Sequence, residues 1–129
     1  AAYWPAFDNR FCYLPNGRFI YTADLILELD PIGNKCRVID SINFSKSQIL
    51  CYDSVDKVVI YKIDPVSVRG SQVIKYQFTT GDTVVLLKGF DASETKQVRP
   101  FTWKKQPTWL LVKNGGRVEI WNRTLSLKK

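Results

Sequence analysis

The chain of 129 residues contains no histidine and no methionine, and it has only three cysteines. The absence of histidine excludes Ser-His-Asp and Cys-His nucleophile systems, and also an imidazole acid or base working near neutral pH. A zinc site would need all three cysteines plus carboxylates, at spacings that no common zinc site has. The sequence therefore predicts no catalytic residue, no metal site and no cofactor, and we expect a protein that is not an enzyme.

Long hydrophobic runs are also missing, since the longest uninterrupted apolar stretches have four residues, 84–87 among them. A membrane-spanning helix needs about 20 such residues, so we expect no membrane span. No secretory or transit segment is recognisable. Because position 1 is not methionine, we expect a processed product or a domain of a longer chain. With 45% hydrophobic and 24% charged residues, the composition is that of a single globular domain over 1–129.

The cysteines, Cys12, Cys36 and Cys51, are odd in number, so at least one thiol stays unpaired within the chain. The strand pattern places Cys36 and Cys51 about 16 Å out of register, whereas a disulfide requires Cα atoms within about 7 Å. We therefore expect three small buried side chains in a reducing compartment, the cytoplasm or a virus-infected cell. An intermolecular disulfide is the alternative. Sequons at Asn43 and Asn122 leave glycosylation open.

The sequence is rich in alternation of apolar and polar side chains with period two. Over 18–30 one parity is apolar, and the other is polar except for Ile20 and Ile26. This pattern predicts one long half-buried strand whose inward row is Phe19, Tyr21, Ala23, Leu25, Leu27 and Leu29. The same pattern predicts strands over 35–44, 48–53, 57–63, 72–79, 83–88, 108–113 and 117–122. Short turns containing Gly or Asn separate most of them, so we expect an antiparallel meander.

About nine to ten strands in a chain of this length leave little or no room for helix. An open meander that wide would expose an apolar face, so we expect an all-β fold closed into a small barrel or folded into a two-layer sandwich. The alternation fails in two segments. Residues 1–9 are expected to form an N-terminal arm, and residues 89–107 an irregular basic loop.

Charge is distributed unevenly along the chain. The first 94 residues sum to −1, whereas residues 95–129 hold nine Lys or Arg and one acid, a net charge of +8. Trp103, Trp109 and Trp121 lie in the same segment. Clustered cations attract anions, and aromatic rings among cations suit single-stranded nucleic acid, because bases stack on rings while phosphates meet the cations. We assign Trp109 to core packing, because it begins an apolar stretch that reads as a buried strand.

The candidate anion-binding residues are therefore cations and aromatics of this segment: Lys96, Arg99, Phe101, Trp103, Lys104, Lys105, Lys113, Arg117, Trp121 and Arg123. Alternation along the last strand places Arg117 and Trp121 on one side, where we expect both to face solvent. The principal hypothesis is a non-enzymatic domain that binds an anionic polymer, above all single-stranded RNA or DNA. An acidic protein, a sulfated glycan and an anionic membrane are the other possible partners.

Two alternatives come from other classes of protein. One is an assembly subunit of the viral or phage structural or accessory type, forming a homo-oligomer or larger assembly through termini and exposed edge strands. The other is a small-ligand-binding barrel of lipocalin-like architecture, which the length suits although the Gly-x-Trp entry motif is missing around Trp4. Asp24, Glu28 and Asp30 are interpreted as outward acids that aid solubility, rather than as a catalytic or calcium site.

Overall fold

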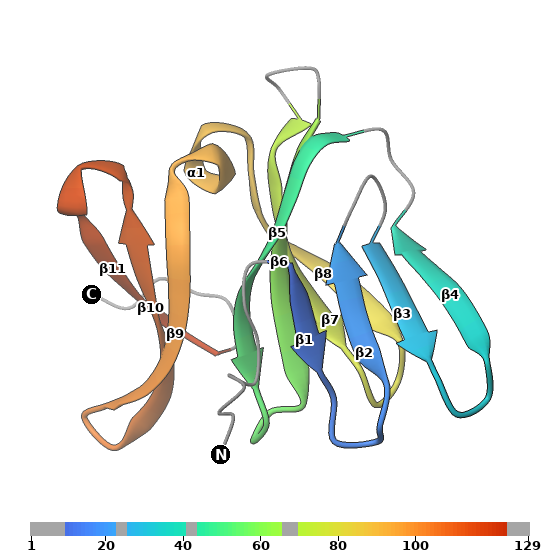
Figure 1. The fold of residues 1–129 in the computed structure, drawn as a ribbon. Coiled ribbons are helices and arrows are strands. Elements are labelled where there is room, and N and C mark those ends of the chain that lie inside the picture. Colours follow the sequence, from blue (N-terminus) through green and yellow to red (C-terminus); the bar gives the residue numbers. More distant parts are fainter. Residues whose placement is uncertain (1–9, 23–25, 41–43, 66–69, 124–129) are drawn as a thin grey trace, which may run out of the picture.

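The computed structural model describes residues 10–22, 26–40, 44–65 and 70–123, which form eleven strands in three antiparallel sheets (Figure 1). The N-terminal sheet contains β1 (Phe11–Tyr13), β2 (Phe19–Thr22), β3 (Ile26–Asp30) and β4 (Lys35–Asp40). The central sheet contains β5 (Phe44–Asp53), β6 (Val58–Pro65), β7 (Gln72–Gln77) and β8 (Asp82–Lys88). The C-terminal sheet contains β9 (Thr95–Trp103), β10 (Gln106–Lys113) and β11 (Val118–Asn122). A short helix, α1 (Gly89–Ser93), precedes β9, and a 3-10 turn, η2 (Asn114–Gly116), precedes β11.

The predicted all-β fold is confirmed, and within each sheet the strands follow one another in chain order, as a meander requires. The barrel alternative is wrong, because no sheet among the described residues is closed. Sheets of three or four strands are too narrow to close, since even small barrels use at least five strands. The sheets stack instead in a sandwich-like arrangement, with the central sheet between the other two (Figure 1).

Strand β6 shows why the central sheet takes this position. Val59, Tyr61 and Ile63 belong to the hydrophobic cluster shared with the N-terminal sheet, whereas Val58 and Ile60 belong to the cluster shared with the C-terminal sheet. All five side chains are at most 2% exposed. A nearly continuous apolar run is typical of a strand buried on both faces, in contrast to the alternation of a half-buried strand.

The segment 18–30, expected to be one long strand, contains the hairpin of β2 and β3, in which Phe19 pairs with Leu29. The expected inward row is also wrong, because the buried residues described in this segment are Ile20, Thr22, Ile26 and Glu28, all of the other parity. Both rows carry large apolar side chains, so alternation alone does not identify the core face. Burial of the Glu28 carboxylate is possible because the Tyr76 hydroxyl donates to it at 2.7 Å and Arg18 donates at 3.3 Å.

The segment 89–107 is not an irregular loop, because it contains α1, all of β9 and the start of β10. Its two prolines lie where a sheet tolerates them. Pro100 is on β9, an edge strand, and Pro107 precedes Thr108, the first residue of β10 that pairs with β11. The predicted arm over 1–9 lies outside the described residues.

The three cysteines differ in burial. Cys12 and Cys51 are buried, Cys36 is exposed, and all three are free thiols. The expectation of three buried side chains is therefore wrong for Cys36. Within the part of the chain that the structure describes, no helix has the length and apolar character needed to cross a membrane.

Candidate anion-binding surface

The exposed side of β9 carries a row of candidate residues. Val98 pairs with Leu111, and both are buried in the core cluster, which identifies the inner face of the C-terminal sheet. Because successive side chains of a strand point to opposite faces, Arg99, Phe101 and Trp103 share the outer face. The sequence analysis placed these residues in an irregular loop, whereas the structure aligns all three on one side of a single strand.

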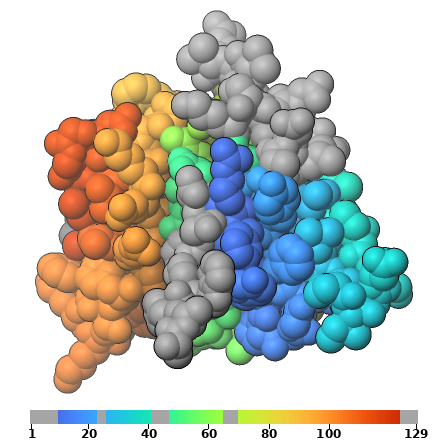
Figure 2. Space-filling model, viewed as in Figure 1, coloured from blue at the N-terminus to red at the C-terminus, as the bar shows by residue number. Residues whose placement is uncertain are grey.

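The row continues into the tip of the β9–β10 hairpin. The Phe101 and Trp103 rings lie 6.4 Å apart between centroids, at an interplanar angle of 58°. Trp103 is 38% exposed, and the Lys104 ammonium group lies 5.6 Å from its ring centroid. Lys104 and Lys105 form the exposed turn, and this orange hairpin projects at the lower left of Figure 2. We call Arg99, Phe101, Trp103, Lys104 and Lys105 the basic hairpin.

The turn at this tip has an unfavourable sequence for its conformation. Lys104 has a φ of 49° and Lys105 a φ of 64°, so both adopt the left-handed region. A two-residue hairpin turn with positive φ at both positions strongly favours Asn-Gly or Asp-Gly. A residue with a Cβ atom costs roughly 1–2 kcal/mol in this region. The hairpin therefore presents two lysines at positions where other residues would give a more stable turn.

Lys96 is exposed but lies apart from the basic hairpin. Val112 pairs with Gln97 and Lys113 with Thr95, so Lys96 is the extra residue of a β-bulge. At about 3.3 Å per residue, it is roughly 26 Å along the strand from Lys104.

Lys113, another candidate, lies in the interior at 1% exposure. Its ammonium group donates to the Asp91 carbonyl oxygen at 2.9 Å and to Thr95 Oγ1 at 2.8 Å, and Glu119 Oε1 lies 3.8 Å away. These contacts attach β10 to α1 and to the start of β9. Lys113 is thus a structural cation with no surface to offer a ligand.

Arg117 and Trp121 do not form a joint solvent-facing site. Arg117 is exposed, but its guanidinium pairs with the buried carboxylate of Glu94. Trp121 packs against the core cluster, and its Nε1 donates to Glu119 Oε1 at 3.1 Å. Arg117 and Trp121 lie on the same side of the chain, as alternation predicts. At Trp121 this side faces the core, because Trp121 pairs with the buried Trp109.

Arg123 is also occupied. It donates to Asp53 Oδ2 at 2.7 Å and to Asp56 Oδ2 at 3.0 Å, and its Nε donates to the Thr108 carbonyl oxygen at 3.2 Å. Its guanidinium carbon lies 5.0 Å from the Trp109 ring centroid. Acids from the first 94 residues therefore neutralise Arg117 and Arg123, which counting charge along the sequence could not reveal.

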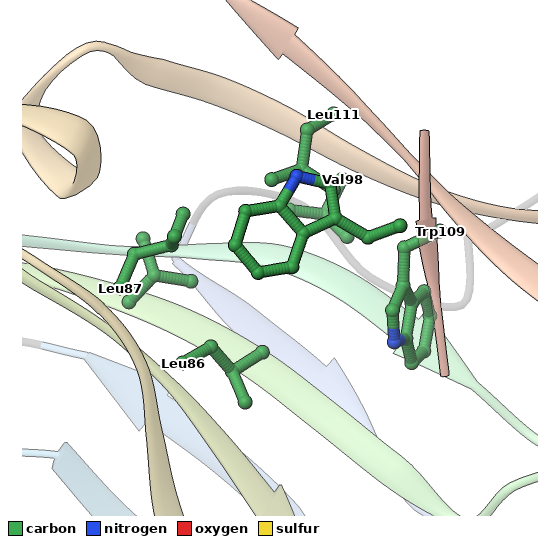
Figure 3. A pocket seen from close by; sticks show the side chains of 7 residues that line it. Leu86, Leu87, Val98, Trp109 and Leu111 are labelled. Carbon is green, nitrogen blue, oxygen red and sulfur yellow. The ribbon is translucent and has the colours of Figure 1, made fainter. Parts of the chain in front are cut away.

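Trp109 is only 2% exposed, which confirms its predicted role in packing. Its indole lines an apolar gap together with Leu86 and Leu87 of β8 and with Val98 and Leu111 of the C-terminal sheet (Figure 3). This apolar gap measures about 10 Å³, which is barely enough for one water molecule. It has no room for an organic ligand, so it gives no support to a ligand-carrying barrel.

Comparison with protein-family models, with curated proteins and with solved structures finds no match to this chain. Among the residues with described positions, no three His, Cys, Asp or Glu side chains are placed to hold a metal ion. The basic hairpin is consequently the candidate site, and its chemistry is that of exposed cations beside aromatic rings.

Proposed function

We propose that this protein binds single-stranded nucleic acid through the basic hairpin. The observation that carries the proposal is the row of Arg99, Phe101 and Trp103 on one face of an edge strand, continued by two turn lysines. Stacking of a base on an aromatic ring contributes about 1–3 kcal/mol, while cations beside the ring meet the phosphates. The row thus combines the two interactions that a single strand offers.

The turn lysines have the charge available for such contacts. Among the described residues, Lys104 and Lys105 have no acidic partner for an ion pair, in contrast to Lys113, Arg117 and Arg123. Their positive φ angles support the proposal as well, because backbone strain that persists at an exposed position is a common feature of functional sites. Both observations point to the tip of the hairpin.

The aromatic pair favours nucleic acid over other anionic polymers. A sulfated glycan would use the cations but has no base to stack on Phe101 and Trp103. Trp103, the more exposed ring, should therefore contribute to oligonucleotide affinity and much less to heparin affinity. This difference separates the proposed ligand from a general polyanion.

The experiment is a titration of a fluorescein-labelled oligo(dT) or oligo(U) 12-mer, followed by anisotropy from about 20 mM to 300 mM salt. Each phosphate contact on a single strand contributes about 0.7 to the slope of log K against log salt. The double variant Lys104→Asn with Lys105→Gly should lower the slope by about 1.4. Trp103→Ala should weaken binding by about 5- to 150-fold, which corresponds to the stacking energy of one base.

A matched control removes the same charge elsewhere. Lys35→Gln with Lys88→Gln changes two exposed lysines, on the N-terminal and central sheets, and should leave affinity within about twofold. Absence of binding at low salt would overturn the proposal, and so would an equal loss in both double variants. If the wild type and Trp103→Ala bind with equal affinity, base stacking does not contribute and the binding is a non-specific attraction to polyanions.

A further inference from the structure

The outer face of the N-terminal sheet is apolar across all four strands. One cross-strand row consists of Phe11, Tyr21, Leu27 and Val38. The adjacent cross-strand row consists of Tyr13, Phe19, Leu29 and Cys36. No side chain in these two rows is charged. Figure 2 shows atoms of β1–β4, blue to cyan, largely uncovered on the visible side.

Several of these side chains are strongly exposed although they are large. Tyr13 is 52% exposed, Tyr21 41% and Val38 48%. The opposite face of the same sheet is apolar too, because Ile20 and Ile26 are fully buried against the central sheet. Strands that are apolar on both faces are typical of sheets covered on both faces. The central sheet has this pattern and is covered twice, whereas the described residues cover the N-terminal sheet once.

We propose that the outer face of the N-terminal sheet packs against the same face of a second copy of this chain. The absence of charge in the two rows leaves a charged partner nothing to pair with, whereas a second copy presents the same apolar rows. A two-fold interface uses one patch twice and requires it to complement itself. The three-layer order of the sheets makes this pairing compatible with the charge of the chain.

Each copy carries a net charge of +7, and the exposed cations of the basic hairpin, Arg99, Lys104 and Lys105, belong to the C-terminal sheet. The C-terminal sheet lies beyond the central sheet, on the side away from the proposed interface (Figure 1). Contact through the N-terminal sheets therefore places the two basic hairpins at opposite ends of the dimer. Contact through the C-terminal sheets would bring the positive segments together, which like-charge repulsion disfavours.

The end of this sheet that carries the turn between β3 and β4 also suits self-association. Ile32, in the turn between β3 and β4, is 89% exposed. A hollow of about 200 Å³ lies at this end of the sheet, with apolar walls from Phe19, Leu29 and Pro31 and a polar rim from Asp30, Asn34 and Lys35. An apolar projection near a hollow with apolar walls lets each copy place the projection in the hollow of the other across a two-fold axis.

The size of the face predicts a reversible dimer rather than an obligate one. Four strands about 4.8 Å apart and about five residues long make a face of roughly 14 by 17 Å. Stable specific interfaces bury about 800 Å² on each partner, whereas this face covers only about 240 Å² before its rim is added, which is the size of a weak, transient contact. We expect half-dimerisation at roughly 10–100 µM, the range of weak association.

The experiment is sedimentation velocity of the full chain from about 1 to 300 µM at 0.15 M salt. The mass of the wild type should rise from 14.9 kDa towards twice that value. Val38→Lys should remain monomeric over this range. The matched control is Val118→Lys, which introduces the same change at 55% exposure on β11, an edge strand of the C-terminal sheet, and should dimerise like the wild type.

Cys36 supplies a second measurement at the proposed interface. It is exposed on this face, whereas Cys12 and Cys51 are buried, so a maleimide should modify Cys36 alone in the folded protein. The rate should fall at least threefold between low and high protein concentration in the wild type and stay constant in Val38→Lys. A wild type that stays monomeric overturns the proposal. Dimerisation that leaves the Cys36 rate unchanged, or that Val118→Lys abolishes equally, also overturns it.

Discussion

The Arg123 guanidinium donates to Asp53 Oδ2 at 2.7 Å, which joins the end of the C-terminal sheet to the turn between β5 and β6 in the central sheet. Asp53 is 4% exposed, and its other carboxylate oxygen accepts from the amide groups of Val55 and Asp56. The carboxylate is therefore fully engaged. A buried charge is tolerated only while such partners remain, so this ion pair fixes the position of the C-terminal sheet against the central sheet.

Replacing Arg123 with methionine should lower the free energy of unfolding by about 3–5 kcal/mol, because the buried Asp53 charge loses its partner. Urea denaturation measures the loss. The double variant Asp53→Asn with Arg123→Met should recover at least half of it, since an asparagine oxygen can still accept from the turn amides. If the single and double variants are equally unstable, the ion pair is not the source of the loss.

The strands were predictable because period-two alternation and short turns are local properties of the sequence. The division into three sheets was not, because it depends on which face of each strand is covered. Ile20 and Ile26 lie in the more polar row of the segment 18–30, yet both are fully buried in their hairpin. The continuous apolar stretch of β6 was the one local signal of burial on two faces.

The candidate site was predictable only where charge and aromatic residues are adjacent in sequence. Phe101 to Lys105 fall together because they lie on one hairpin. Lys113, Arg117 and Arg123 leave the site because their partners come from elsewhere in the chain: Asp91, Glu94 and Asp53. Such long-range pairings are fixed by tertiary structure, so the sequence alone gives no measure of them.

The hairpin turn should become more stable when its lysines are replaced. Lys104→Asn with Lys105→Gly gives the sequence that a turn with two positive φ angles prefers, so we expect a gain of about 1–2 kcal/mol. The melting temperature should rise by about 3–8 °C. The control Lys104→Ala with Lys105→Ala removes the same charges but keeps both Cβ atoms. Equal melting temperatures for the two variants would show that charge repulsion, not backbone strain, sets the stability of the turn.

Lys113→Met should destabilise the fold by about 1.5–3 kcal/mol, because a charged donor is lost from the Asp91 carbonyl oxygen and from the buried Thr95 hydroxyl oxygen. Urea denaturation again measures the change. The exposed Lys96→Met serves as the control and should change stability by less than about 0.5 kcal/mol. Among folded molecules, Lys113→Met should bind oligonucleotide as the wild type does. A lower salt slope for this variant would show that Lys113 contacts a phosphate of the oligonucleotide.

Stability should fall on the alkaline side, because buried groups resist becoming negatively charged. Burial, assisted by the hydrogen bond to Glu28, raises the pKa of Tyr76 to about 12. Burial also raises the pKa of the Cys12 and Cys51 thiols to about 12. The unfolded chain loses these protons near pH 9 to 10 while the folded chain keeps them up to about pH 12. The unfolded state thus binds fewer protons in this window, and the free energy of unfolding decreases as pH rises through it.

Tyr76→Phe should make this decrease shallower, since it removes one group whose pKa is raised by folding. The measurement is the urea midpoint of both proteins at pH 8, 9.5, 10.5 and 11.5. All other titrating groups are the same in both proteins, so the difference between the two curves isolates the tyrosine. Tyr76→Phe should be the less stable protein at pH 8, where Glu28 has lost a donor, and the gap should narrow above pH 10. A constant gap across this range would mean that the Tyr76 hydroxyl ionises equally readily in the folded and unfolded chains.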